Sequence, residues 1–198
     1  MLAIVLPTVV AGEAAYSSDR HLLDFYARQH TAVHLSAFLT LASSVPMAVF
    51  SAIASDRIRA AGFEVPGRLI ALVGGTIAAA MLATSGLVAL ALTQPHAADR
   101  LDLVRALYGV SFATAGPGFV VFSGLLLAGI SIPVMIGRLA PAWIAWLGLA
   151  LAAACELASL SALTGTLDPL LAVGRFGAMI WMLAIAFTLR RGPRRAQS

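Results

Sequence analysis

The fold class is decided by residues 69–93, which read LIALVGGTIAAAMLATSGLVALALT. These 25 residues include no charged side chain, and about 20 apolar residues suffice for a helix to cross a hydrocarbon core of ~30 Å. Their apolar character is continuous rather than alternating, which is typical of a membrane-spanning helix and not of a barrel strand. The stretch therefore predicts a transmembrane α-helix.

Similar apolar runs recur along the whole sequence. With 69–93 they make six, the others being 1–16, 31–54, a run within 106–136, 140–163 and 170–189. We expect an all-α fold, a polytopic transmembrane helix bundle with six spans. At 198 residues, one domain over 1–198 is expected.

The first run, 1–16, has two interpretations. It is either a retained, short and tilted helix or a cleaved signal peptide, with residues 2–10 as the apolar region and the cut at Ala14 or Ala15. No basic residue precedes it, which counts against a signal peptide. A cleaved peptide would leave five spans with the same orientation.

The composition excludes several classes of protein. With 60% hydrophobic and 11% charged residues, and a mean hydropathy of +0.92, a soluble domain is not expected. The isoelectric point near 10.2 does not indicate nucleic-acid binding, because the basic residues lie at the ends of apolar runs, where anionic lipids attract them. All basic residues other than His are Arg, which, with the abundant Ala, is typical of a GC-rich bacterial genome.

Arginines alternate in number between successive loops. One set of loops and the C-terminal tail carry eight, namely Arg57, Arg59, Arg68, Arg138, Arg190, Arg191, Arg194 and Arg195. The opposite loops carry four, namely Arg20, Arg28, Arg100 and Arg105. The positive-inside rule places the eight-arginine side in the cytoplasm, so we expect an inner-membrane protein with both termini cytoplasmic. Anionic lipids are the expected partners of these arginine-rich ends.

The fourth run is too long for one straight span, since its 31 residues would reach roughly 46 Å as one helix. Gly116-Pro117-Gly118 interrupts it and predicts a kink, and Pro46 predicts a bend in the second run. Such kinks can line a transport site. Alternatively, they reflect only the high frequency of Gly and Pro in membrane helices.

Small residues at four-residue spacing predict close helix packing within the chain. They are Gly75, Ala79 and Ala83 in the third run, and Ala150, Ala154 and Ala158 in the fifth. A face for a homodimer is the alternative, although nothing in the sequence indicates an oligomer. Trp143 and Trp146 are placed near the cytoplasmic interface and Trp181 deeper.

Charges inside the apolar runs are the first candidates for a functional site, because they are costly in hydrocarbon. Glu156 and Arg175 lie on consecutive antiparallel runs, both roughly 9–12 Å below the outer boundary at ~1.5 Å per residue. They are expected to face each other. The pair has two interpretations: neutralised charges that fix helix register, or a substrate or proton site.

Two histidines one helical turn apart, His30 and His34, share a face of the second run. Glu13 and Arg105 are expected at a similar height, in the outer half of the bundle. His-x3-His on a helix can bind zinc or copper, with Glu13 or Glu156 as a third ligand. The alternative, which we favour, is an interfacial His30 and a hydrogen-bonded His34 inside the bundle, with no metal or other cofactor.

Catalytic and nucleotide-binding signatures are absent from the sequence. It has no Walker loop, nucleophile elbow, zinc-protease motif or dinucleotide fingerprint. Cys155 is the only cysteine, which excludes an intramolecular disulfide and a cysteine-based zinc site of the usual kind.

The stretch after Arg138, with Pro141-Ala142-Trp143 and then Trp146-Leu147-Gly148, resembles the opening of the penultimate helix in uncharacterised small multi-pass membrane proteins of actinobacteria (DUF4386-like). The polar segment from Asp24 to His34 is also similar. The resemblance implies a six-helix membrane bundle and transfers no catalytic residues.

The sequence therefore predicts an integral membrane protein, small and transporter-like or accessory, with a polar cluster in its outer half. Two alternatives stay open. One is a membrane-embedded enzyme that uses His30, His34 and an acid, with or without a bound metal ion. The other is a structural or partner-binding subunit whose charges only fix packing.

Overall fold

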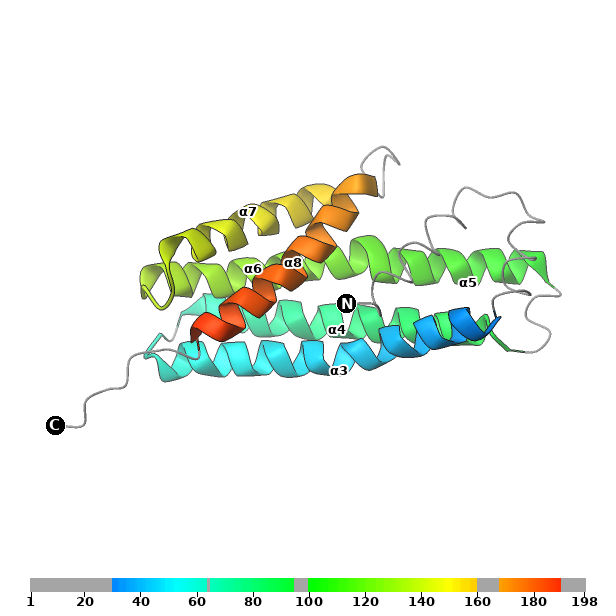
Figure 1. The fold of residues 1–198 in the computed structure, drawn as a ribbon, viewed down its shortest axis with the longest axis horizontal. Helices are drawn as coiled ribbons and strands as arrows, with labels where there is room; N and C mark the ends of the chain where they lie inside the picture. Colours follow the sequence, from blue (N-terminus) through cyan, green and yellow to red (C-terminus); the bar gives the residue numbers. More distant parts are fainter. Residues whose placement is uncertain (1–29, 64, 95–99, 160–167, 190–198) are drawn as a thin grey trace. The chain divides into compact units, whose positions relative to one another are not determined.

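The computed structural model describes residues 30–63, 65–94, 100–159 and 168–189. Within these ranges every regular element is a helix (Figure 1). In chain order the elements are α3 (His30–Ala60), α4 (Pro66–Ala91), α5 (Leu101–Ala113), the π-helix η2 (Thr114–Gly118), α6 (Phe119–Ile136), α7 (Ala142–Ser159) and α8 (Asp168–Leu189). The first predicted run, 1–16, lies outside the described residues.

The described helices are those of an α-helical membrane protein. Three are long and apolar enough to cross a membrane, namely Thr31–Ala60, Pro66–Ala91 and Leu101–Ile136. Two shorter apolar helices cover Ala142–Ala158 and Gly174–Thr188. The all-helical, apolar character agrees with the sequence prediction, and the number of six spans stays a prediction.

The predicted break in the fourth run is confirmed. Gly116 leaves the helical region, with φ −90° and ψ −106°, and the π-helix η2 surrounds it between α5 and α6. Pro117 cannot donate a backbone hydrogen bond, and a π-turn accommodates such a missing bond without ending the helix. The helix α3 continues through Pro46 without a break, and the bend expected there stays a prediction.

The chain divides into two compact units, which are described separately below. Unit 1 contains 30–46 and 79–119, and unit 2 contains 47–78 and the described residues from 120 onward. The prediction of a single domain is not tested by this division.

In unit 1, α3, α4 and α5 pack through small and hydroxyl-bearing residues. A Cβ added to Gly86 on α4 would lie 2.6 Å from the backbone N of Leu41 on α3, so only glycine permits this approach. Ser85 Oγ donates to the Ser111 carbonyl (2.9 Å), and Ser111 Oγ lies 3.2 Å from the Ser85 carbonyl. These paired serine contacts join α4 to α5 without leaving buried hydroxyls unsatisfied.

In unit 2, α4 and α6 approach closely through glycines on both helices. A Cβ added to Gly74 would lie 2.7 Å from the Leu126 backbone N, and one added to Gly129 would lie 2.5 Å from the Ala71 backbone N. Gly75, singled out from the sequence, packs on Ser51 of α3. The prediction of intrachain packing by small residues on this helix is therefore confirmed at Gly75.

The predicted packing face of α7 is confirmed at Ala158, whereas Ala154 is only partly buried and the prediction is wrong at Ala150. Ala150 is exposed, whereas Ala145, Gly148 and Ala152 are buried. The helix is rich in alanine, so small residues recur at four-residue spacing on more than one of its faces. Spacing alone could not identify the face that packs. Ala158, from the predicted set, is buried.

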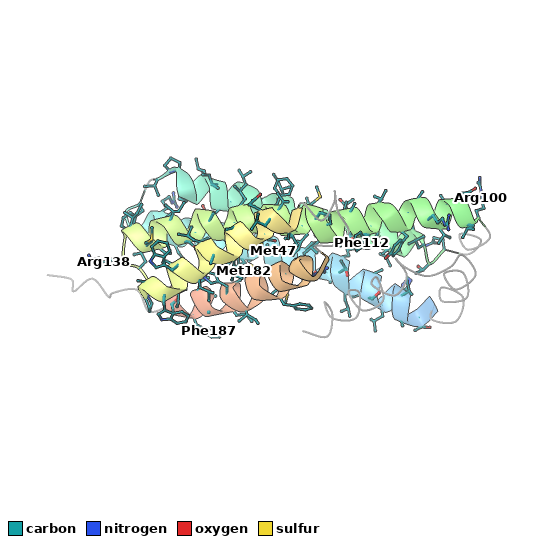
Figure 2. All side chains as sticks on the ribbon, turned by 90° about the horizontal axis from the view of Figure 1, so that it is seen from above. Met47, Arg100, Phe112, Arg138, Met182 and Phe187 are labelled. Carbon is teal, nitrogen blue, oxygen red and sulfur yellow. The ribbon has the colours of Figure 1, made fainter. Side chains whose placement is uncertain are left out.

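The three tryptophans differ in burial, but the expected greater depth of Trp181 is not borne out, because its indole bonds to Ile144, at the level of Trp143 and Trp146. Trp143 and Trp146 are each 63% exposed near the start of α7, just after the turn that contains Arg138 (Figure 2). Trp181 on α8 is 1% exposed, and its indole Nε1 donates to the Ile144 carbonyl at 2.7 Å. This bond joins α8 to α7, which pack against each other (Figure 1).

Candidate functional site

Three helices of unit 2 meet at Cys155, which is fully buried on α7. A Cβ added to Gly174 of α8 would lie 3.3 Å from Cys155 Sγ and 3.2 Å from Val120 Cγ1 of α6. A Cβ added to Gly124 of α6 would lie 2.9 Å from Cys155 Cβ. Because each neighbour contributes a glycine, α6, α7 and α8 reach van der Waals contact at one level.

The two candidate charges follow directly after the residues of this junction. Glu156 follows Cys155 on α7, and Arg175 follows Gly174 on α8. Because α7 and α8 run antiparallel, the Cys155–Gly174 contact places Glu156 and Arg175 within two residues, about 3 Å, of the same level along the two helices. That level agrees with the equal depth inferred from the sequence, whereas a direct Glu156–Arg175 ion pair stays a prediction.

The two charges differ in burial. Arg175 is only 9% exposed, whereas Glu156 is an exposed residue. A Cβ added to Gly124 would lie 3.3 Å from Glu156 Oε1, so this carboxylate oxygen lies over the glycine surface of α6. This difference in burial could not be predicted, because the sequence indicates depth along a helix but not the direction of each side chain.

A charged residue in an apolar helix needs an explanation. Insertion of Arg at a helix centre costs about 2.5–3.5 kcal/mol on the translocon scale. The guanidinium stays protonated in proteins, so Arg175 cannot lower this cost by losing its charge. Its burial among apolar helices is therefore the most costly single electrostatic feature at this junction.

Sequence reasoning did not single out the serines of α6. Among the described residues, Ser123 and Ser131 have buried hydroxyl oxygens without a hydrogen-bond partner. Ser123 immediately precedes Gly124, in the part of α6 that contacts α7 and α8. The available signal was a polar residue within a run that is otherwise apolar, and such residues are common enough in membrane helices to be overlooked.

The other candidate residues belong to unit 1. His34 Nδ1 lies 3.0 Å from Thr93 Oγ1, and this hydroxyl donates to the Leu90 carbonyl at 2.7 Å. Because Thr93 donates its hydroxyl proton to the Leu90 carbonyl, its oxygen acts as the acceptor toward His34. Nδ1 of His34 is therefore the protonated nitrogen and donates to Thr93 Oγ1. The hydrogen bond expected for His34 is present, whereas its expected place inside the bundle is not borne out, because the residue is exposed.

Arg105 and Tyr108 lie on α5 of the same unit. Arg105 is exposed, whereas Tyr108 is partly buried against a small apolar cluster of Val33, Leu92 and Val104. The Tyr108 ring also stacks on Phe112, with centroids 6.3 Å apart. Arg105 and His34 thus belong to unit 1, and Glu156 and Arg175 to unit 2.

The metal hypothesis is not tested by the described part of the chain. Glu13 and the side chain of His30 lie outside it. Within the described residues, no group of three or more His, Cys, Asp or Glu side chains could hold a metal ion.

Comparisons with protein-family models, with curated proteins and with solved structures find no match to this chain. The functional argument therefore rests on the geometry above.

Proposed function

We propose that the chain is a multi-pass inner-membrane protein with six spans, small and transporter-like or accessory, whose site surrounds Arg175 and Glu156. The observation that carries the proposal is the burial of Arg175 on an apolar helix, level with Glu156. Ionisable residues inside membrane helices usually mark substrate or proton paths. We also place the chain with the actinobacterial membrane proteins that its Trp143–Gly148 stretch resembles.

The unequal burial of the two charges favours a functional role over a purely architectural one. An ion pair that only fixes helix register is most effective when both charges are buried and fully hydrogen-bonded. Here the carboxylate of Glu156 belongs to an exposed residue, whereas the guanidinium of Arg175 is buried. A proton could therefore reach the carboxylate of Glu156 without first passing the guanidinium of Arg175.

The native Cys155 provides the test, because it is the only thiol, it precedes Glu156 in sequence, and α6 and α8 enclose it, so it reacts only if the junction opens to water. If a water-filled path opens to this level, a membrane-impermeant methanethiosulfonate reagent should label Cys155 slowly in intact cells. A thiolate is the reactive species, so labelling requires water at the sulfur. Mass spectrometry of the purified protein would measure the labelled fraction over time.

Two variants control this experiment. Cys155→Ser removes the thiol and should abolish labelling. In the Cys155→Ser background, Leu157→Cys places a thiol on an exposed apolar position of the same helix, which should face lipid and react poorly. Complete protection of Cys155, with reactivity restored only in denaturant, would show a dry junction and contradict a transport role.

The orientation of the proposed bundle is tested separately. A cysteine at Arg59, in a Cys155→Ser background, should react with an impermeant maleimide only after the cells are opened, because the eight-arginine side is expected in the cytoplasm. A cysteine at exposed Arg100 should react in intact cells. Labelling of the Arg59 position from outside would overturn the topology.

A further inference from the structure

In unit 2, the helices α3 and α6 end in the same kind of turn, the Schellman motif. After α6, the backbone N–H of Leu139 donates to the Val134 carbonyl at 3.1 Å. The N–H of Arg138 donates to the Met135 carbonyl at 3.4 Å, and the turn after α3 repeats both bonds around Gly62. The motif needs one residue with left-handed backbone. That residue is Gly62, at φ 89°, in the first turn and Arg138, at φ 50°, in the second.

Packing does not explain an arginine at this position. The left-handed region is unfavourable for a residue with a Cβ, which is why glycine usually occupies it. The preceding Gly137 is required by packing, because a Cβ there would meet the Phe63 ring. Arg138, by contrast, is exposed, and among the described residues its side chain has no ion pair or hydrogen bond. Strained residues of this kind gather at sites that bind ligands.

Arg68 supplies a second guanidinium at the same end of unit 2. It follows Gly67 in the first turn of α4, and a Cβ added to Gly67 would lie 3.0 Å from Pro133 Cγ in the last turn of α6. The start of α4 therefore packs against the end of α6. Nε of Arg68 is enclosed and has no hydrogen-bond partner in the described part of the chain. Because the residue as a whole is partly exposed, its terminal amino groups are the donors that a ligand can reach.

The surface beside Arg138 is suited to the headgroup level of a bilayer. Trp143 and Trp146, near the start of α7, are each 63% exposed (Figure 2), and tryptophans of membrane proteins gather at this level. Ile136, two residues before Arg138, is 61% exposed and offers apolar surface to acyl chains. Lipid phosphates are therefore the anions closest to the Arg138 guanidinium.

We propose that the turn at Arg138 and the start of α4 bind the headgroup of an anionic phospholipid. Arg138 and Arg68 donate to its phosphate oxygens, because a planar guanidinium matches a phosphate with two parallel hydrogen bonds. The sequence predicts only a general attraction of lipid to every arginine-rich end, whereas the structure separates these two residues from Arg59, which is paired with Asp56 at 2.8 Å. The inference goes beyond the proposed function and does not depend on the site at Arg175.

Quenching of tryptophan fluorescence by brominated lipids tests the site. Phosphatidylglycerol and phosphatidylcholine with brominated acyl chains are compared as quenchers of Trp143 and Trp146 in mixed bilayers, and the ratio of quenching gives the preference for anionic lipid. Trp181, which is 1% exposed, adds the same background to both measurements. We expect Arg138→Gly to lower the preference about fivefold, the effect of one arginine near an anionic surface.

The same variant should be more stable than the unchanged protein. Glycine adopts the left-handed backbone without strain, so Arg138→Gly should raise the Tm in detergent without added lipid. Arg68→Gln should also lower the preference for anionic lipid. The matched control, Arg59→Gln, should leave the preference unchanged, because Arg59 is already paired with an acid on the same helix.

Three results would overturn the proposal. One is an unchanged lipid preference, or a lower Tm, in Arg138→Gly. Another is an equal loss of preference in Arg59→Gln, which would show that lipids respond to total charge and not to a site. The third is a larger loss of preference in inorganic phosphate than in sodium chloride of the same ionic strength, which would show that the two arginines bind a soluble phosphate instead of lipid.

Discussion

Gly148→Leu is expected to abolish the folded state of unit 2, and Gly148→Ala to lower its free energy of unfolding by ~1–3 kcal/mol, the usual cost of overpacking a core. A Cβ added to Gly148 would lie 2.5 Å from Trp181 Cζ2 and would also meet Ser131 Oγ. Trp181 cannot turn aside easily, because its indole donates a 2.7 Å hydrogen bond to the Ile144 carbonyl. The added atoms therefore force α6, α7 and α8 apart.

Thermal unfolding in detergent, followed by helix content, measures the effect. Gly109→Ala is the matched control, because a Cβ added there meets nothing within 4 Å and the residue also lies within a helix. Alanine favours helix over glycine by roughly 1 kcal/mol in water, so this control should leave stability unchanged or slightly higher. Equal stability of the Gly148→Ala and Gly109→Ala variants would show that the α6–α7–α8 contact is not rigid.

Gly116 and Gly148 show which features of the fold the sequence could predict and which it could not. Continuous apolar runs identify membrane helices, and Gly-Pro-Gly identifies the break at Gly116, because both depend on local chemistry. The need for glycine at Gly148 depends on Trp181, 33 residues away in sequence. Such a contact requires knowing which way each helix faces, and an apolar helix with small residues all round gives no direction.

The candidate site likewise has features that local sequence predicts and features that depend on distant contacts. The level shared by Glu156 and Arg175 follows from counting residues along two antiparallel helices, and the structure agrees with it through the Cys155–Gly174 contact. The exposure of Glu156 beside the burial of Arg175 does not follow from counting. Thr93, which bonds to His34, is 59 residues from it, so its role could not be read from local sequence.

Neutralising the two charges at this junction should have unequal effects. Glu156→Gln would leave Arg175 charged and buried, and its cost should approach the ~3–5 kcal/mol of a broken buried pair only if the two groups bond directly. Arg175→Gln should cost less, because a carboxylate left alone on an exposed position can be discharged by binding a proton, whereas a guanidinium cannot. If the two groups interact, the double variant should lose less stability than the sum of the single losses.

A double-mutant cycle tests this expectation. It compares the unchanged protein, the two single variants and the double variant by thermal unfolding in detergent. Asp56 and Arg59 supply the control, since they form an ion pair at 2.8 Å with side chains 63% and 60% exposed. Exposed pairs of this kind contribute at most ~1 kcal/mol, so Asp56→Asn and Arg59→Gln should change little. Strictly additive losses of stability in the Glu156→Gln and Arg175→Gln variants would exclude a direct interaction between the two side chains. A larger loss for Arg175→Gln than for Glu156→Gln would instead show that the guanidinium stabilises the junction through groups other than Glu156, and the acid would then have no part in holding it.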